Sequence, residues 1–75
     1  SHTLTVSLAA PIVLPAPLAA RVARADGAEL AFAFDSFDEV AGLLEGVRAA
    51  GGNVLDMALG KPDMEQVFVG IMNQN

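Results

Sequence analysis

The stretch AELAFAFDSFDEV, residues Ala28 to Val40, contains the change of periodicity that decides the fold. In its first half, large apolar residues alternate with alanine, which is the two-residue period of a β-strand with one buried face. The large residues are Leu30, Phe32 and Phe34, and we expect them to face a core. The alanine face leaves room for another element to lie close. This stretch is the clearest strand in the chain.

A helix is predicted to open at Asp35-Ser36, directly after that strand. Ser36 and Glu39 have the spacing of a capping box, in which each side chain accepts a hydrogen bond from a free backbone N–H of the first turn. Gly51-Gly52 is expected to end the helix, since glycine adopts the left-handed cap conformation without steric cost. The expected apolar stripe of this helix is Phe37, Val40, Ala41, Leu44 and Val47.

Weaker patterns on either side complete a series of short elements. Thr3 to Leu8 alternates as a half-buried strand, and Leu14 to Ala20 could form a short helix because proline is tolerated in a first turn. Arg21 to Arg24 is a weak strand, followed by a two-residue hairpin signal at Asp26-Gly27. Asn53 to Leu59 is expected to form a strand with one apolar face, made of Leu55, Met57 and Leu59.

The chain closes with KPDMEQVF, residues 61–68, followed by VGIM. Asp63 and Gln66 repeat the capping-box spacing, and Pro62 precedes the cap. The residues Met64, Val67, Phe68 and Ile71 then fall at i, i+3, i+4 and i+7. This pattern predicts an amphipathic helix of about nine residues, too short to be stable alone in water, which must therefore dock on something.

These elements follow the order of a ferredoxin-like βαββαβ plait, an α+β fold with a four-stranded antiparallel sheet and helices on one face. The C-terminal helix is an addition to that plait. It could cover the open face of the sheet, cover an edge, or extend towards a partner. We interpret Ser1-His2 as a cloning remnant, so that residues 3–75 form a single small domain and the one histidine is not native.

Composition excludes several classes of function. The chain of 75 residues has no cysteine, a net charge of −5 and four basic residues that form no run. Nucleic-acid binding needs clustered cations and is disfavoured. Direct membrane insertion is also not expected, because the apolar stretch Leu8 to Ala20 is shorter than the roughly 20 residues of a bilayer span and is broken by prolines.

Four short patterns resemble sites but have simpler interpretations. Gly60-Lys61 lacks the upstream glycine and the following Ser or Thr of a Walker A loop. The acidic cluster Asp35, Asp38 and Glu39 could hold a hard cation, but capping and the helix dipole explain it. Asp63 and Glu65 are interpreted as capping in the same way. Gly42 and Gly46 allow close helix packing or are simply tolerated. We therefore predict no catalytic, cofactor-binding or metal-binding residue in this chain.

The run AGGNVLDMALGKPDMEQVFVGIM resembles the end of many ABC transporter ATP-binding subunits. Their small C-terminal accessory domain closes with a helix, a glycine turn, a strand and a P-S-L-E-E/D-V-F helix. The segment DEVAGLLEGVRAAG also resembles the family's L-L-x-x-L-x-x-x-G pattern, so the similarity covers residues 36–72. Here Asp63 and Met64 replace the family's serine and leucine. The matching positions are Gly51-Gly52, Val54, Pro62, Glu65, Val67 and Phe68.

The resemblance implies a non-catalytic structural or regulatory domain excised from a longer cytoplasmic ATPase subunit, which lies on the inner face of the cell membrane. ATP and magnesium would then bind only in the parent's nucleotide-binding domain. The implied partners are that domain or its paired copy, and the transporter's membrane subunit. The docking helix would supply Pro62, Asp63, Met64, Glu65, Val67, Phe68 and Ile71. The alternative is a small-molecule-sensing regulatory domain of plait fold, with effectors bound near Gly51-Gly52 or Asp26-Gly27.

Overall fold

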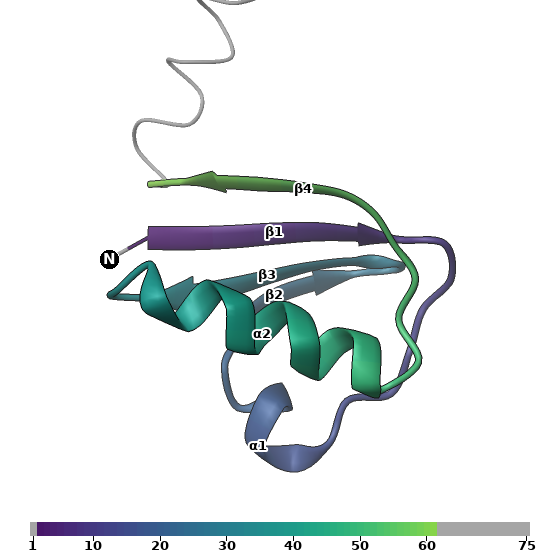
Figure 1. The fold of residues 1–75 in the computed structure, drawn as a ribbon. Helices are drawn as coiled ribbons and strands as arrows, with labels where there is room; N and C mark the ends of the chain where they lie inside the picture. Colours follow the sequence, from purple (N-terminus) through teal and green to yellow (C-terminus); the bar gives the residue numbers. More distant parts are fainter. Residues whose placement is uncertain (1, 62–75) are drawn as a thin grey trace, which may run out of the picture.

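A computed structural model describes residues 2–61 of the chain (Figure 1). The predicted order of six elements is confirmed. The predicted C-terminal helix, with all of its docking residues from Pro62 to Ile71, lies outside the described residues. The elements are β1 (His2–Leu8), α1 (Ala16–Ala19), β2 (Val22–Asp26), β3 (Glu29–Phe34), α2 (Asp38–Ala49) and β4 (Val54–Gly60).

The four strands form one antiparallel sheet in the order β2-β3-β1-β4, as expected for the α+β fold class. Each helical crossover passes over one strand: α1 leads from β1 to β2 across β3, and α2 leads from β3 to β4 across β1. Leu4 pairs with Phe32 on one side and with Leu59 on the other. Since cross-strand partners share a face, β1 fixes which side chains of both neighbours point towards the helices.

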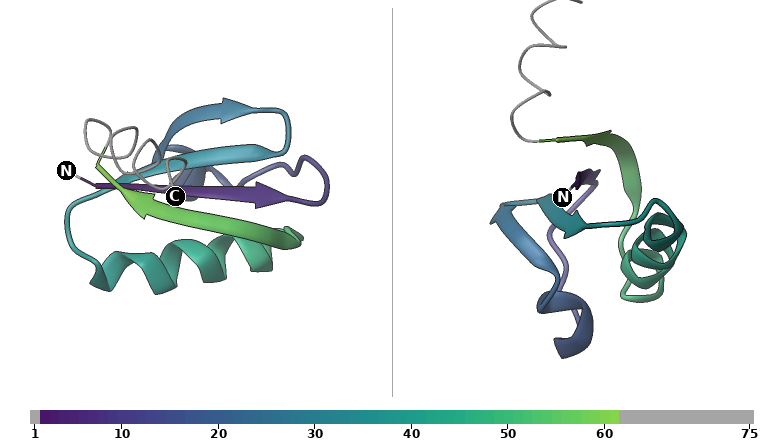
Figure 2. Two further views of the ribbon diagram at one scale, coloured as in Figure 1. Left: turned by 90° about the horizontal axis from the view of Figure 1, so that it is seen from above. Right: turned by 90° about the vertical axis from the view of Figure 1, so that its left-hand side faces the viewer.

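Both helices lie on the same face of the sheet (Figure 1), and no described element lies over the other face, as the end-on view of Figure 2 shows. The core forms between that sheet face and α2, and the alternation predicted for β3 is confirmed there. Burial of the core side chains is the main source of stability, because each Å² of apolar area removed from water contributes roughly 25 cal/mol to the free energy of folding. The buried cluster is Leu4, Val6, Leu8, Leu30, Phe32, Phe34, Leu43 and Val47.

The β2–β3 hairpin turns one residue later than its sequence signal indicates. Asp26 and Glu29 are register partners, so the two turn residues are Gly27 and Ala28 rather than Asp26 and Gly27. Gly27 has φ +60°, and no non-glycine residue has positive φ in the described chain. A positive φ at the first turn residue alone fits a type II′ turn, which places glycine first. Asp26 can therefore remain in the strand.

α1 is shorter than the predicted helix from Leu14 to Ala20. Its first hydrogen bonds run from the backbone N–H groups of Leu18 and Ala19 to the carbonyl oxygen of Pro15, at 3.0 and 2.9 Å. Proline has no N–H to donate and restricts the residue before it to extended conformations. The helix therefore begins only after Pro15, and it ends after one turn because the chain continues into β2 at Val22.

The predicted apolar stripe of α2 is partly wrong. Leu43 is buried, although the predicted stripe omits it, whereas Phe37 and Ala41 are exposed. The helix begins at Asp38, so Phe37 precedes it. At about 100° of turn per residue, Ala41 lies on the side away from the core. The stripe that packs on the sheet is Val40, Leu43, Leu44 and Val47.

Both ends of α2 are capped as the sequence indicates, with one difference in detail. The Glu39 carboxylate accepts from the Ser36 backbone N–H at 3.0 Å, but the Ser36 hydroxyl accepts from Asp38 rather than from Glu39. At the other end, Gly52 N–H donates to Val47 O and Gly51 N–H to Arg48 O, at 2.9 and 3.0 Å. This pair of bonds is a Schellman motif, and Gly51 has the left-handed φ of +95° that it requires.

β4 forms one edge of the sheet. It corresponds to the strand predicted from Asn53 to Leu59, shifted by one residue. Its apolar side chains are exposed by 67% at Leu55, 44% at Met57 and 44% at Leu59. Met57 and Leu59 pair with the buried residues Val6 and Leu4, so they point to the helix side of the sheet. Because α2 packs on the inner strands of the sheet, it leaves Met57 and Leu59 partly uncovered.

Candidate functional site

The acidic cluster at the N-terminus of α2 is one candidate site suggested by the sequence, and Glu39 lies at its centre. The Glu39 carboxylate accepts hydrogen bonds from the backbone N–H groups of Ser36 and Asp35, each at 3.0 Å, and forms an ion pair with Arg21. These backbone bonds, followed by the Arg21 guanidinium, lower the pKa of Glu39 to about 2 from its ordinary 4.5. The ionised Glu39 carboxylate is therefore held by its hydrogen bonds at the N-terminal cap of α2.

The cation interpretation of this acidic cluster gains no support from the geometry. Within residues 2–61, no group of three or more His, Cys, Asp and Glu side chains converges in a way that could hold a metal ion. Gly60-Lys61 likewise sits at the end of β4, where Gly60 pairs with Thr3 and Lys61 is exposed. Gly60 therefore belongs to the strand, and the residues after Lys61 lie outside the described part of the chain.

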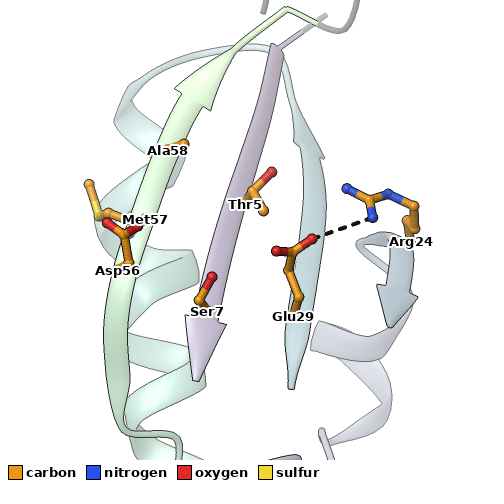
Figure 3. Close-up of a pocket in the computed structure, with 7 residues that line it drawn as sticks. All are labelled: Thr5, Ser7, Arg24, Glu29, Asp56, Met57 and Ala58. Carbon is orange, nitrogen blue, oxygen red and sulfur yellow. Dashed lines mark hydrogen bonds and ion pairs between the residues drawn. The ribbon is translucent and has the colours of Figure 1, made fainter. Parts of the chain in front are cut away.

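The open face of the sheet contains a shallow polar depression of about 250 Å³ (Figure 3). Side chains from all four strands line it, because alternate residues of each strand point away from the helices. Arg24 and Glu29 approach to 3.5 Å across its β2 side, and the Asp56 carboxylate accepts from the Met57 backbone N–H at 2.9 Å. The side chains of Thr5, Ser7, Arg24, Glu29, Asp56 and Ala58 line it on this face. Met57 also borders the depression, although its pairing with the buried Val6 directs its side chain to the helix side.

The depression is lined by two hydroxyls and by charged side chains. Its hydroxyls, Thr5 and Ser7, have no hydrogen-bonded base among the described side chains, and a nucleophile needs such a base or a lowered pKa to be activated. Its charged groups are one guanidinium and two carboxylates. The arrangement suits a small polar molecule or a polar protein surface. Its residues are dispersed in the sequence, so only the strand register brings them together.

The alanine face of β3 forms part of this open surface. Ala31 is buried to 3% exposure between its register partners Thr5 and Arg24, whereas Ala33 is exposed. The expectation that a further element lies close to this face is not met by any element of residues 2–61. The small alanine side chains therefore leave this part of the sheet surface flat, and the polar neighbours keep it hydrated.

A second hollow of about 340 Å³ lies between α1 and α2, lined partly by Pro17, Arg21 and Gly42. The two glycines of α2 play different parts beside it. A Cβ on Gly46 would meet Leu18 at 3.0 Å, so this glycine lets α1 approach α2. A Cβ on Gly42 would meet nothing within 4 Å. Close packing therefore explains Gly46 alone.

An aromatic cluster at the Asp35 end of β3 is absent from the sequence-based prediction. His2 pairs with Phe34, and their rings stack with centroids 5.3 Å apart. Phe37 lies 4.7 Å from His2 and meets Phe34 edge-on at 5.4 Å. Periodicity assigns Phe37 to the helix stripe and gives His2 no role, so their spacing carries no signal of this contact. The interpretation of Ser1-His2 as a cloning remnant stays a prediction.

The largest concentration of exposed apolar side chains on one described element is on β4. We call Leu55, Met57 and Leu59 the β4 stripe. None of the helices in the described part of the chain is both long enough and apolar enough to cross a membrane. Exposed apolar rows of this kind mark contact surfaces when they share an edge.

Comparison with known proteins adds no assignment: no family model, no curated protein and no solved structure matches this chain.

Proposed function

We propose that this chain is the non-catalytic C-terminal accessory domain of an ABC transporter ATP-binding subunit. In this proposal the domain has a structural or regulatory role, and its parent energises transmembrane transport by ATP hydrolysis. The parent lies in the cytoplasm, on the inner face of the cell membrane. ATP and magnesium bind in the parent's nucleotide-binding domain and not in this domain.

The observation that carries the proposal is the order of features that leads into the PDMEQVF motif. A helix, α2, ends in the Schellman turn at Gly51-Gly52, and the edge strand β4 follows. The motif begins within two residues of the end of that strand. The ABC accessory domains to which the sequence is similar close with the same succession of helix, glycine turn, strand and motif.

We further propose that the fold is a ferredoxin-like plait and that residues Pro62 to Ile71 add a docking helix to it. Because the open sheet face is polar, we propose that this apolar helix docks on a partner rather than on that face. The partner is the domain's own or the paired nucleotide-binding domain, with the transporter's membrane subunit as a further contact.

Deletion of residues 61–75 from the full-length parent tests this role. We expect the domain to remain folded and assembly and transport to be lost, because the deletion removes the apolar docking residues and leaves the core, which lies within residues 2–60. Proteolysis, size-exclusion chromatography and transport assays measure the three properties. Deletion of only Asn73 to Asn75 is the matched control, since these residues are polar. Unchanged assembly and transport in the longer deletion would contradict the proposal.

The open-face depression favours a second function, a small-molecule-sensing domain. Its polar lining of Arg24, Glu29 and Asp56 offers both a cation and carboxylates to a small ligand. The depression lies on the sheet face and not at Asp26-Gly27 or Gly51-Gly52, where the sequence alone places effector binding. NMR titration with amino acids and nucleotides separates the two functions. Saturable shifts in the depression or at either turn support sensing, and their absence supports the accessory role.

A further inference from the structure

The outer edge of β4 presents backbone groups that no other described strand pairs. β4 is the last strand of the sheet order and bonds only to β1. The Met57 N–H donates to the Asp56 side chain at 2.9 Å, so it points away from β1 and towards the free edge. Backbone groups of a strand alternate in direction with a two-residue period. Leu59 therefore presents its N–H and C=O to the same edge.

The sequence of this edge is self-complementary in one antiparallel register. When Met57 faces Met57 of a second copy, Leu55 faces Leu59 and Asp56 faces Ala58. All members of the β4 stripe then have an apolar partner. Met57, whose N–H points outward, faces Met57 as a hydrogen-bonded pair requires, and this N–H would exchange the Asp56 carboxylate for the carbonyl oxygen of the second copy. The same register keeps the two Asp56 carboxylates diagonal rather than opposed. The pairing of β4 with β1 shifts register at Leu55, between Val54 and Asp56.

The neighbouring registers are worse. A shift of the two-fold axis to Asp56 places two carboxylates directly opposite each other, which is destabilising. A shift to Ala58 places Leu55 against Lys61 and leaves it without an apolar partner. A shift that pairs even with odd positions would turn apolar side chains of one copy against the polar face of the other. Charge and apolarity thus select the register centred on Met57.

We propose that two copies of this chain associate through β4 to form one continuous eight-stranded sheet with the two-fold axis at Met57. The two-fold axis runs perpendicular to the sheet, so both helix layers share one face and both polar depressions share the other. Exposed apolar edge strands associate in this way unless charges block them. Asp56 is the only charged residue of β4, and in this register it faces alanine. The association is independent of the ABC assignment.

Sedimentation velocity on the 75-residue chain tests the association. Because a single strand pair is a small interface, we expect a dissociation constant of about 10 µM to 1 mM. Met57→Lys places two cations in contact at the axis and should weaken association at least about tenfold. Val13→Lys is the matched control, because Val13 is 91% exposed and lies outside β4. A chain that stays monomeric to millimolar concentration, or equal weakening by both variants, overturns the proposal.

Cysteine pairing tests the register. Facing Cα atoms of a hydrogen-bonded antiparallel pair lie about 5.5 Å apart, within the range that a disulfide spans. Under mild oxidation, Met57→Cys should give a covalent dimer, whereas Ala58→Cys should not, since position 58 faces position 56 of the second copy. The chain has no other cysteine to compete. Faster dimer formation by Ala58→Cys would contradict this register, and the absence of a crosslink in both variants would overturn the proposed pairing of two copies.

Discussion

Three glycines on or just after α2 differ in the space around them. A Cβ added to Gly42 would have nothing within 4 Å, and one added to Gly46 would meet a flexible Leu18 methyl group at 3.0 Å. At Gly52 a Cβ would come within 2.6 Å of the Val47 side chain and 2.9 Å of its carbonyl oxygen. The backbone carbonyl cannot move without breaking the Schellman turn, so glycine is required only at this last position among the three.

Alanine substitution at two of these positions should change stability in opposite directions. Gly42→Ala should stabilise the domain by about 0.5–1 kcal/mol, because an exposed helix interior favours alanine. Gly52→Ala should destabilise it by about 1–3 kcal/mol, the usual cost of forcing an atom into occupied space. Urea unfolding of the two variants measures both changes. A destabilised Gly42→Ala or a neutral Gly52→Ala would contradict the packing described.

The lowered pKa of Glu39 gives the domain a predictable response to acid. Its pKa falls from 4.5 to about 2 on folding, so between these values the unfolded chain binds more protons than the native chain. The stabilisation is complete above about pH 5 and is lost as the pH falls towards about 2. Glu39→Gln should therefore lower stability at neutral pH and flatten the decline in the acid range.

Urea unfolding from about pH 2 to about pH 7 measures this response. Glu45→Gln is the matched control, because among the described residues Glu45 pairs with Arg48 alone, on the exposed side of the same helix. It should leave the pH dependence close to that of the unchanged chain. An identical decline in the Glu39 and Glu45 variants would show that the Asp35, Ser36 and Arg21 contacts do not hold the carboxylate.

At the scale of elements, α2 offers a test of which residues form its buried face. Leu43 is 4% exposed in the core, whereas Phe37 is 58% exposed before the first turn. Leu43→Ala should cost about 2–5 kcal/mol, and Phe37→Ala should cost less despite removing a larger side chain. Thermal unfolding followed by circular dichroism compares them. A larger loss for Phe37→Ala would restore the stripe expected from sequence.

The elements that could be predicted from the sequence are those whose signals are local. The alternation of β3, the Glu39 cap and the Gly51-Gly52 stop depend on neighbouring residues, and all three are present. The hairpin turn and the α2 stripe are displaced from their predicted positions because each depends on a starting point that periodicity does not fix. The exposure of β4 could not be predicted, since it depends on which strand becomes the edge.

The candidate site is less predictable than the fold. The depression joins Ser7, Arg24, Glu29 and Asp56 through the registers of three strand pairs. No spacing in the sequence encodes those registers. The aromatic contact of His2 with Phe37 arises in the same way, from the pairing of β1 with β3. The docking residues predicted from Pro62 to Ile71 stay a prediction, because they lie outside the described part of the chain.

At the scale of the whole molecule, the large apolar side chains of residues 2–61 form two main groups, apart from the exposed Val13 and Phe37. One set fills the core between the sheet and α2, and the other lies exposed along β4, next to the start of the PDMEQVF motif. The opposite sheet face is polar. In the described residues, the domain therefore has one apolar edge available for contacts and one polar face.

The most direct measurement for the proposed ABC transporter assignment is the nucleotide sequence immediately upstream of the segment that encodes this chain. We predict an open reading frame continuous with residue Thr3 that encodes a Walker A loop followed by an ABC signature. Thr3 is the reference point because Ser1-His2 is interpreted as a cloning remnant. An in-frame stop codon, or an upstream domain without either motif, would contradict the assignment to an ABC transporter ATP-binding subunit.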